Sequence, residues 1–298
     1  MSGTPSPDSP AEPPSGPPSG LTDGLRLAVG TLSVFPVRPG IVDRRAGGTA
    51  MTAAPFVGAL LGAVCAVVLT GALWLGVTPL LASVLAVAAL ALLTRGLHLD
   101  GLADLADGLG SGKPAAQALD IMKKSDIGPF GVVTLILTLM VQVAALSEVA
   151  AAGRGQIALV IACVAGRLAL TWACRAGVPA ARPGGLGALV AGTVRRGPAL
   201  AVTALVLLGA AVLTPAYEIG ALDPPLSLLA GSLSPDERLP DSVSGLLGPS
   251  LAVVAGLLAA WVLRRRATRR LGGITGDVLG ALVEIATTAA LVVCAAVV

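Results

Sequence analysis

MTAAPFVGALLGAVCAVVLTGALWLGV, residues 51–77, continues into TPLLASVLAVAALALLTRGL, residues 78–97, and these two stretches decide the fold. A helix needs about 20 predominantly apolar residues to cross a bilayer, and each stretch is long enough. The turn between them is very short. We therefore predict two membrane-spanning helices that run antiparallel as a hairpin.

The composition of the whole chain supports a membrane protein. Apolar residues make up 55% of it and charged residues only 12%, whereas soluble domains carry about 25% charged residues. The apolar residues are mostly Ala, Leu and Val with Gly among them, and small side chains let membrane helices approach closely. We predict an all-α fold, a polytopic bundle of membrane helices.

Further apolar runs bring the expected number of spans to about seven. A segment before them, Leu21–Phe35, is predicted to lie on the membrane surface as an amphipathic helix, and the polar connector Lys113–Ile127 to be partly helical. We expect a disordered Pro/Ser/Gly-rich tail over residues 1–20 and one membrane-embedded catalytic domain over residues 21–298. The later spans are predicted over Gly128–Ala150, Gln156–Cys174, Pro198–Tyr217, Leu251–Leu263 (short for a span) and Asp277–Val298.

The basic residues indicate how these spans are oriented. With the N-terminus in the cytoplasm, only Arg154 and Arg238 among the loop Arg and Lys residues fall outside, which is the positive-inside pattern. The densest basic run, RRRATRR at residues 264–270, is interpreted as an anchor against anionic lipid. We expect a multi-pass protein of the cell membrane (inner or plasma membrane) whose active site faces the cytoplasm. Three polar segments, the stretch after residue 94, the Gly-rich loop Arg175–Gly197 and the start of the last span, then share one membrane face.

The strongest functional signal directly follows the hairpin, in RGLHLDGLADLADGLGSG at residues 95–112. On a helix, Asp100, Asp104 and Asp107 share one face, and like charges at that spacing repel. A cation would offset the repulsion, and Mg²⁺ prefers carboxylate oxygens and often bridges to a substrate phosphate. We predict one or two Mg²⁺ ions that clamp a diphosphate. The alternative is a solvated helix end, but three aspartates on one face beside the only histidine favour a site.

Two neighbouring features keep two interpretations each. His98 can act as a base toward an attacking hydroxyl, because its ordinary pKa lies near neutrality, or it can orient a carboxylate. Lys123 and Lys124 can meet phosphate oxygens while Asp126 joins the metal site. The alternative for this second group is a surface pair between Asp120 and Lys124, four residues apart.

Charged residues inside the later spans are further candidates. Arg167 is costly within a membrane and is a site candidate by default, or it pairs structurally with a carboxylate such as Glu284. Asp277 follows a Gly-rich block that opens the last span. Asp277 and Glu284, seven residues apart, share a helix face.

Four segments, taken in order, resemble one known family. They are HLDGLADLADGLGSG, IMKKSDIGPFGV, ARPGGLG and LGGITGDVLGALVEI, and SVFPVRP near the start fits the same pattern. The chain resembles, from about Leu25 to its C-terminus, the cobalamin synthase family of membrane-bound adenosylcobinamide-GDP ribazoletransferases. This resemblance implies a Mg²⁺-dependent, phosphotransferase-type enzyme that joins adenosylcobinamide-GDP to α-ribazole, or to its 5′-phosphate, and releases GMP.

The resemblance also implies roles for individual residues. His98 and Asp104 are expected to be catalytic. One departure concerns the four connector residues from Lys123 to Asp126. Many members of the family have an acid at the second of these positions and a base at the fourth, whereas this chain has Lys124 second and Asp126 fourth. The expected metal ligands are Asp100, Asp104, Asp107 and Asp277. The expected substrate-binding residues are Lys123, Lys124, Asp126, Arg167, Arg182, Gly185, Gly187, Thr275 and Glu284.

A transporter or ion-coupled permease is the rival from another class, because intramembrane charges and Gly-broken helices suit it too. No internal repeat relates the two halves, and the acids gather at one face instead of mid-bilayer. A catalytically inactive scaffold is a third interpretation, against which all the motif acids are present. The expected partners are the two substrates and the lipid bilayer, without nucleic acid, and a homo-oligomer is left open.

Overall fold

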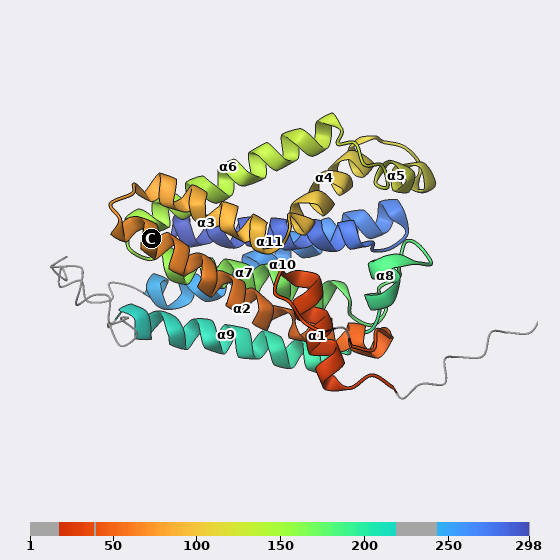
Figure 1. Ribbon diagram of the computed structural model, residues 1–298, viewed down its shortest axis with the longest axis horizontal. Helices are drawn as coiled ribbons and strands as arrows, with labels where there is room; N and C mark the ends of the chain where they lie inside the picture. Colours follow the sequence, from red (N-terminus) through yellow and green to blue (C-terminus); the bar gives the residue numbers. More distant parts are fainter. Residues whose placement is uncertain (1–17, 39, 219–242, 298) are drawn as a thin grey trace, which may run out of the picture.

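The computed structural model describes residues 18–38, 40–218 and 243–297. In these residues it has eleven helices and two isolated β-bridges but no strand, which confirms the all-α fold (Figure 1). The predicted tail up to Gly20 and the polar connection after Glu218 lie largely outside the described residues. The helices are α1 (Leu21–Leu32), α2 (Arg44–Trp74), α3 (Pro79–Leu93), α4 (Leu97–Gly110), α5 (Ala115–Ile121), α6 (Pro129–Ala151), α7 (Gly155–Ala173), α8 (Gly185–Val190), α9 (Arg196–Glu218), α10 (Val243–Leu271) and α11 (Gly276–Ala296).

The helix lengths agree roughly with the expected seven spans. Five helices are long and apolar enough to cross a membrane, namely α2, α6, α7, α10 and α11. The bent pair α3 and α4 supplies a sixth when counted as one span, and α9 has a shorter apolar part, Arg196–Val212. The polytopic helical bundle is therefore confirmed, and the cytoplasmic N-terminus stays a prediction.

The second predicted span differs from the structure. It was expected to run straight to Leu97, but α3 ends at Leu93 and α4 leaves it at an angle of 88°. The backbone takes left-handed conformations at Arg95 (φ 55°) and Gly96 (φ 66°), and a helix cannot continue through such residues. The bend turns the acidic motif out of line with the hairpin and onto other helices of the bundle.

The predicted end of the sixth span is also wrong. Instead of stopping at Leu263, α10 continues through the whole basic run to Leu271. Arginine is a good helix former, so a charged run leaves the membrane without breaking the helix. Five positive charges, at Arg264, Arg265, Arg266, Arg269 and Arg270, therefore stand on the last turns of a membrane helix.

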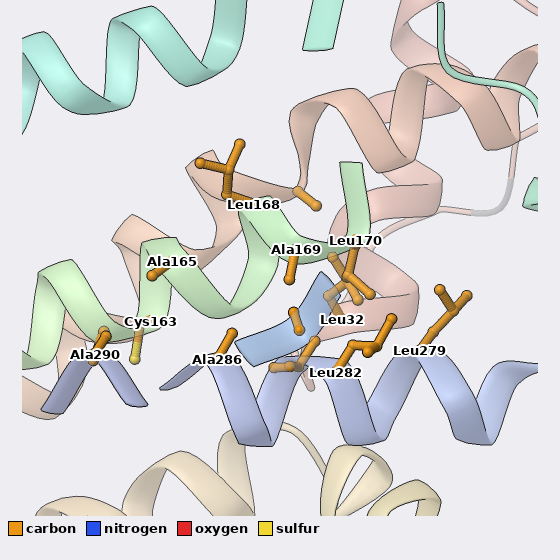
Figure 2. Packing of buried hydrophobic residues seen from close by; sticks show 14 of the residues in the cluster. Leu32, Cys163, Ala165, Leu168, Ala169, Leu170, Leu279, Leu282, Ala286 and Ala290 are labelled. Carbon is orange, nitrogen blue, oxygen red and sulfur yellow. The ribbon is translucent and has the colours of Figure 1, made fainter. Parts of the chain in front are cut away.

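The core depends on small residues that let helices touch. A Cβ at Gly58 in α2 would lie 2.5 Å from the carbonyl oxygen of Cys163 in α7, and one at Gly62 would lie 2.7 Å from the Cα of Val160. Such close backbone packing is the usual means of association for membrane helices. Figure 2 shows the neighbouring layer of buried side chains between α7 and α11, including Ala169 and Leu282.

The predicted amphipathic helix before the first span is present as α1, and a capped turn joins it to α2. Its position on the membrane surface stays a prediction. Asp43 is the N-cap of α2, where its carboxylate accepts hydrogen bonds from the backbone N–H of Ala46 (2.7 Å) and from the hydroxyl of Ser19 (2.6 Å). These bonds, that of Ala46 first, lower the pKa of the Asp43 carboxyl below its ordinary value. The cap thereby ties the chain before α1 to the first long span.

Candidate active site

One pocket of about 290 Å³ gathers the three polar segments that were predicted to share a membrane face. In Figure 1, α4, α8 and the start of α11 lie near the same end of the molecule. Both apolar and polar residues line the pocket. The polar or glycine positions that line it are Thr31, His98, Asp100, Arg182, Gly184, Gly185, Gly187, Thr275, Gly276, Asp277 and Gly280.

Two glycines bring the acidic motif against the last helix. A Cβ at Gly101 would lie 2.7 Å from the carbonyl oxygen and 2.9 Å from the Cα of Asp277, and one at Gly280 would lie 3.2 Å from the Cα of His98. Helices α4 and α11 thus cross nearly backbone to backbone, which no larger side chain permits. Asp100 and Asp277 consequently line one pocket although 177 residues separate them.

The Gly-rich loop is held to the start of α11 by its backbone. The N–H of Ala181 donates to the carbonyl of Ile274 (3.0 Å), and the N–H of Ile274 donates to the carbonyl of Pro179 (2.9 Å). A Cβ at Gly187 would lie 2.8 Å from the Cα of Thr275. The loop therefore forms a wall of the pocket, close against the last segment.

Helix α8 is fixed from the other side by the first long span. The guanidinium of Arg44, at the start of α2, donates to the carbonyls of Ala188 and Ala191, the latter at 2.6 Å. Gly185, at the first position of α8, has a φ of 81° that side chains rarely adopt. A glycine is therefore required where the loop enters this helix.

The site has a strongly negative character. Asp104 interacts electrostatically with Asp100, Asp277 and Asp107, and the cation that acts on it is Arg182. Arg182 acts on Asp277 as well. Carboxylates at this spacing repel one another, so the arrangement favours a bound cation over an empty site.

The last aspartate of the column has a defined structural contact. Asp107 is 8% exposed and accepts hydrogen bonds from the backbone N–H groups of Gly128 (2.7 Å) and Gly131 (3.0 Å). These groups lie at the N-terminus of α6, whose dipole favours a negative charge. Asp107 thus joins the end of α4 to the start of α6, and its predicted role as a metal ligand stays a prediction.

His98 lies buried at the inner side of the pocket. It is 3% exposed, and neither ring nitrogen has a hydrogen-bond partner in the described part of the chain. The interpretation that His98 orients a carboxylate therefore has no hydrogen bond to support it here. A buried polar group without a partner is costly, and one that lines a pocket is available to a ligand.

The starts of α11 and of the Gly-rich loop supply further polar groups. The hydroxyl of Thr275 accepts from the N–H of Val278 (3.2 Å) as the N-cap of α11 and donates to Asp277 (3.2 Å). The guanidinium of Arg182 donates to the carbonyl of Leu119 in α5. Of the predicted substrate-binding residues, Arg182, Gly185, Gly187 and Thr275 line the pocket.

Arg167 and Glu284 lie inside the bundle and do not line the pocket. Arg167 is 1% exposed and Glu284 7%. Glu284 accepts from the amide of Gln142 in α6 (2.9 Å) and interacts electrostatically with Arg167. Two nitrogens of the Arg167 guanidinium, Nε and Nη2, have no hydrogen-bond partner among the described residues, so the structural pairing of Arg167 with Glu284 stays a prediction.

The connector residues Lys123, Lys124 and Asp126 are exposed and do not line the pocket. Helix α5 ends at Ile121, so Asp120 and Lys124 do not share a helix. Neither of the two interpretations for this group gains a contact from the structure.

The oxygen donors of the site bear on whether it can hold a magnesium ion. Within the described ranges, no three His, Cys, Asp or Glu side chains stand in a ready arrangement around one metal position. Asp100, Asp104 and Asp277 nevertheless interact with one another and carry oxygen donors only, which is the chemistry that Mg²⁺ takes. These three carboxylates fit the ion by charge and donor type.

Sequence reasoning missed the apolar wall of the pocket, which includes Leu32, Met51 and Leu170. No local pattern marks these residues, because they come from α1, α2 and α7 and meet only through the packing of the bundle. Gly280 was also missed, although its place one turn after Asp277 on the same helix was a usable signal.

Known proteins are similar to this chain over nearly its whole length. Residues 24–295 match the family model described as cobalamin-5-phosphate synthase. The chain is 42% identical over 280 residues to the adenosylcobinamide-GDP ribazoletransferase of Frankia casuarinae, with 91% of this chain and 93% of the relative covered. It is 36% identical to the protein of that name from a Nocardioides species, with 93% and 100% covered, and 37% identical to that of Bradyrhizobium diazoefficiens, with 91% and 93% covered. No solved structure matches the chain.

Proposed function

Because this chain belongs to the cobalamin-5-phosphate synthase family, we propose that it is an adenosylcobinamide-GDP ribazoletransferase of a late step in cobalamin synthesis. A hydroxyl of α-ribazole attacks the phosphorus attached to cobinamide. An O–P bond forms there, the bond from that phosphorus to GMP breaks, and GMP leaves with the electron pair. The hydroxyl proton passes to a base of the enzyme. The 5′-phosphate of α-ribazole is the alternative acceptor.

The pocket where three distant segments meet is the observation that carries this proposal. Phosphoryl transfer depends on positioning and charge stabilisation more than on covalent chemistry. The rim offers Arg182 for phosphate oxygens and the carboxylates Asp100 and Asp277 for a cation. A diphosphate substrate needs both kinds of group at one place.

We place the proposed magnesium site at Asp100, Asp104 and Asp277. Bound there, Mg²⁺ would offset charge on the diphosphate and on the departing GMP. Asp107 serves the site by positioning α4 on α6. Arg182 holds phosphate oxygens and partly offsets the repulsion among the acids.

His98 is the base that we propose for the attacking hydroxyl. It lines the pocket, and a ring nitrogen without a hydrogen-bond partner can accept the proton. The apolar wall around it keeps water from the phosphorus, which lowers competing hydrolysis. The protein is multi-pass, and we propose the cytoplasmic face of the cell membrane as the location of the pocket, since the positive-inside pattern of the basic residues favours that side. The transporter interpretation is not favoured, because the relatives carry the name of a transferase.

GMP release by the purified protein in lipid tests the proposal. Adenosylcobinamide-GDP and α-ribazole are supplied together and singly, with Mg²⁺ and with chelator. We expect GMP only with both substrates and the metal. Asp104→Asn should abolish release, while Asp120→Asn, an exposed carboxylate on α5 outside the pocket, should retain it. Equal release by both variants would overturn the assignment of the site, and no GMP from a folded preparation would overturn the activity.

A further inference from the structure

A second cavity lies between α7 and α10, away from the proposed active site. It measures about 490 Å³, and its wall is almost wholly apolar, with Val254, Leu257 and Leu258 on α10. Leu258 is 57% exposed on this surface. Because α7 and α10 are both long enough to span a membrane, the apolar groove faces the part of the protein that lipid surrounds.

One end of the groove carries aromatic and basic side chains. Trp172 and Trp261 line it, and so do Arg175, just after the end of α7, and Arg264, on α10. Tryptophan is enriched where a membrane meets water. The groove therefore passes from hydrocarbon depth to the polar interface along one pair of helices.

The charges at this end lack a compensating acid. Arg264 interacts electrostatically with Arg175 and Arg265, all of one sign, and no carboxylate is among the described residues that line the groove. Arg265 lies over the ring of Trp261, 4.7 Å from its centroid, which is a favourable cation–π distance. Two guanidinium groups that line the same groove and repel each other fit an anion.

We propose that this groove binds one anionic phospholipid. Its acyl chains lie along Val254, Leu257 and Leu258, and its phosphate lies between Arg175 and Arg264. A membrane lipid fits better than free phosphate, because the apolar wall is continuous with the basic end and is open to the bilayer. This is a site for one molecule, in contrast to the general attraction of the RRRATRR run for a charged surface, and it does not depend on the proposed enzymatic activity.

The positions of the tryptophans allow a direct test. The chain has three, and only Trp74 lies outside the groove, so Trp74→Phe leaves fluorescence from the groove alone. The Trp74→Phe variant is placed in phosphatidylcholine bilayers. One series contains increasing fractions of phosphatidylglycerol that is brominated on its acyl chains, and the other contains increasing fractions of equally brominated phosphatidylcholine. We expect brominated phosphatidylglycerol to quench at a much lower mole fraction. Equal quenching by the two lipids would overturn the proposal.

Matched double variants separate the groove from the basic run. In the proposed site each groove arginine makes a charge-assisted hydrogen bond to the lipid phosphate, so Arg175→Gln with Arg264→Gln should lower the relative binding constant for phosphatidylglycerol by roughly 100-fold. Arg266→Gln with Arg269→Gln removes the same charge from exposed positions outside the groove and should change it by less than about 3-fold, since salt screens distant charges. Lysine at both groove positions should preserve the preference in a folded protein. Equal losses in the two glutamine doubles would assign the effect to the basic run and refute a defined site.

Discussion

The crossing of α4 and α11 gives the most demanding prediction, for Gly101→Ala. The added Cβ would lie 2.7 Å from the carbonyl oxygen of Asp277, whereas ordinary contact begins at 3.4 Å. The two helices must therefore part by about 0.7 Å, and overpacking of this kind costs about 1–3 kcal/mol. Alanine returns about 1 kcal/mol of that through its higher helix propensity. We expect the thermal unfolding midpoint to fall only modestly.

The effect on catalysis should be larger than the effect on stability. Parting α4 from α11 moves Asp100 away from Asp277 within the pocket. A displacement of about 1 Å can cost about 100-fold in rate, so we expect GMP release to fall by roughly 10- to 100-fold in kcat/KM. Thermal unfolding in detergent and steady-state GMP release on the same preparation measure the two effects.

Two other glycines turn this prediction into a graded series. Gly280→Ala meets His98 at 3.2 Å, so a few tenths of an ångström of movement suffice and the loss should be smaller. Gly71→Ala in α2 meets nothing within 4 Å and should leave activity unchanged. Gly101→Ala with activity within twofold of the parent protein would refute the reasoning, because the close crossing would then not set the geometry of the pocket.

Three further changes separate structural from chemical roles. Asp107→Asn removes the charge that the N-terminus of α6 binds, so we expect chemical unfolding to show about 1–3 kcal/mol lower stability. Asp104→Asn should lose activity without this loss of stability, because it relieves repulsion among the carboxylates. Equal destabilisation by the two variants would contradict these roles. Gln142→Ala leaves the buried oxygen of Glu284 without its hydrogen-bond donor and should lower the free energy of unfolding by about 1–3 kcal/mol. The KM should be nearly unchanged, since Glu284 does not line the pocket. A raised KM at unchanged stability would contradict this structural role. Asp43→Ala should lower the thermal unfolding midpoint at pH 7. Because folding lowers the pKa of Asp43, the stabilisation by its ionised form is present above the unfolded pKa and is lost as the pH falls through the folded pKa. A difference between variant and parent that persists at acid pH would contradict the capping role.

The sequence predicted the elements of this fold well where a long apolar run decided them. It failed at Arg95 and Gly96, because an apolar run reports burial in lipid and carries no information on a local reversal of φ. It failed again at the end of α10, because charge was taken as the end of a helix although arginine favours helices. In both cases the backbone preference competed with the hydrophobic pattern and decided the outcome.

The candidate site was predictable to the level of segments and less so to the level of contacts. The positive-inside pattern placed three distant polar segments on one face, and His98, Arg182 and Asp277 do line one pocket. Helical spacing placed Asp107 with its column, but it could not show that the N-terminus of α6 would lie against that carboxylate. Likewise, the charge of Glu284 suggested a functional site. The sequence could not show that Gln142 would donate to this carboxylate, because the contact depends on how α6 packs on α11.

The contact between Gly101 and Asp277 has a consequence for the biogenesis of the protein. The ribosome delivers α4 early and α11 late, so a partly synthesised chain carries the acidic helix without the surface on which it packs. Until α11 has inserted, Asp100 and Asp104 lack Asp277, the third carboxylate of the proposed magnesium site, and His98 lacks its neighbour Gly280. The pocket is completed only when the last helix enters the membrane, so an unfinished chain holds no working site and a finished one gains it in a single assembly step.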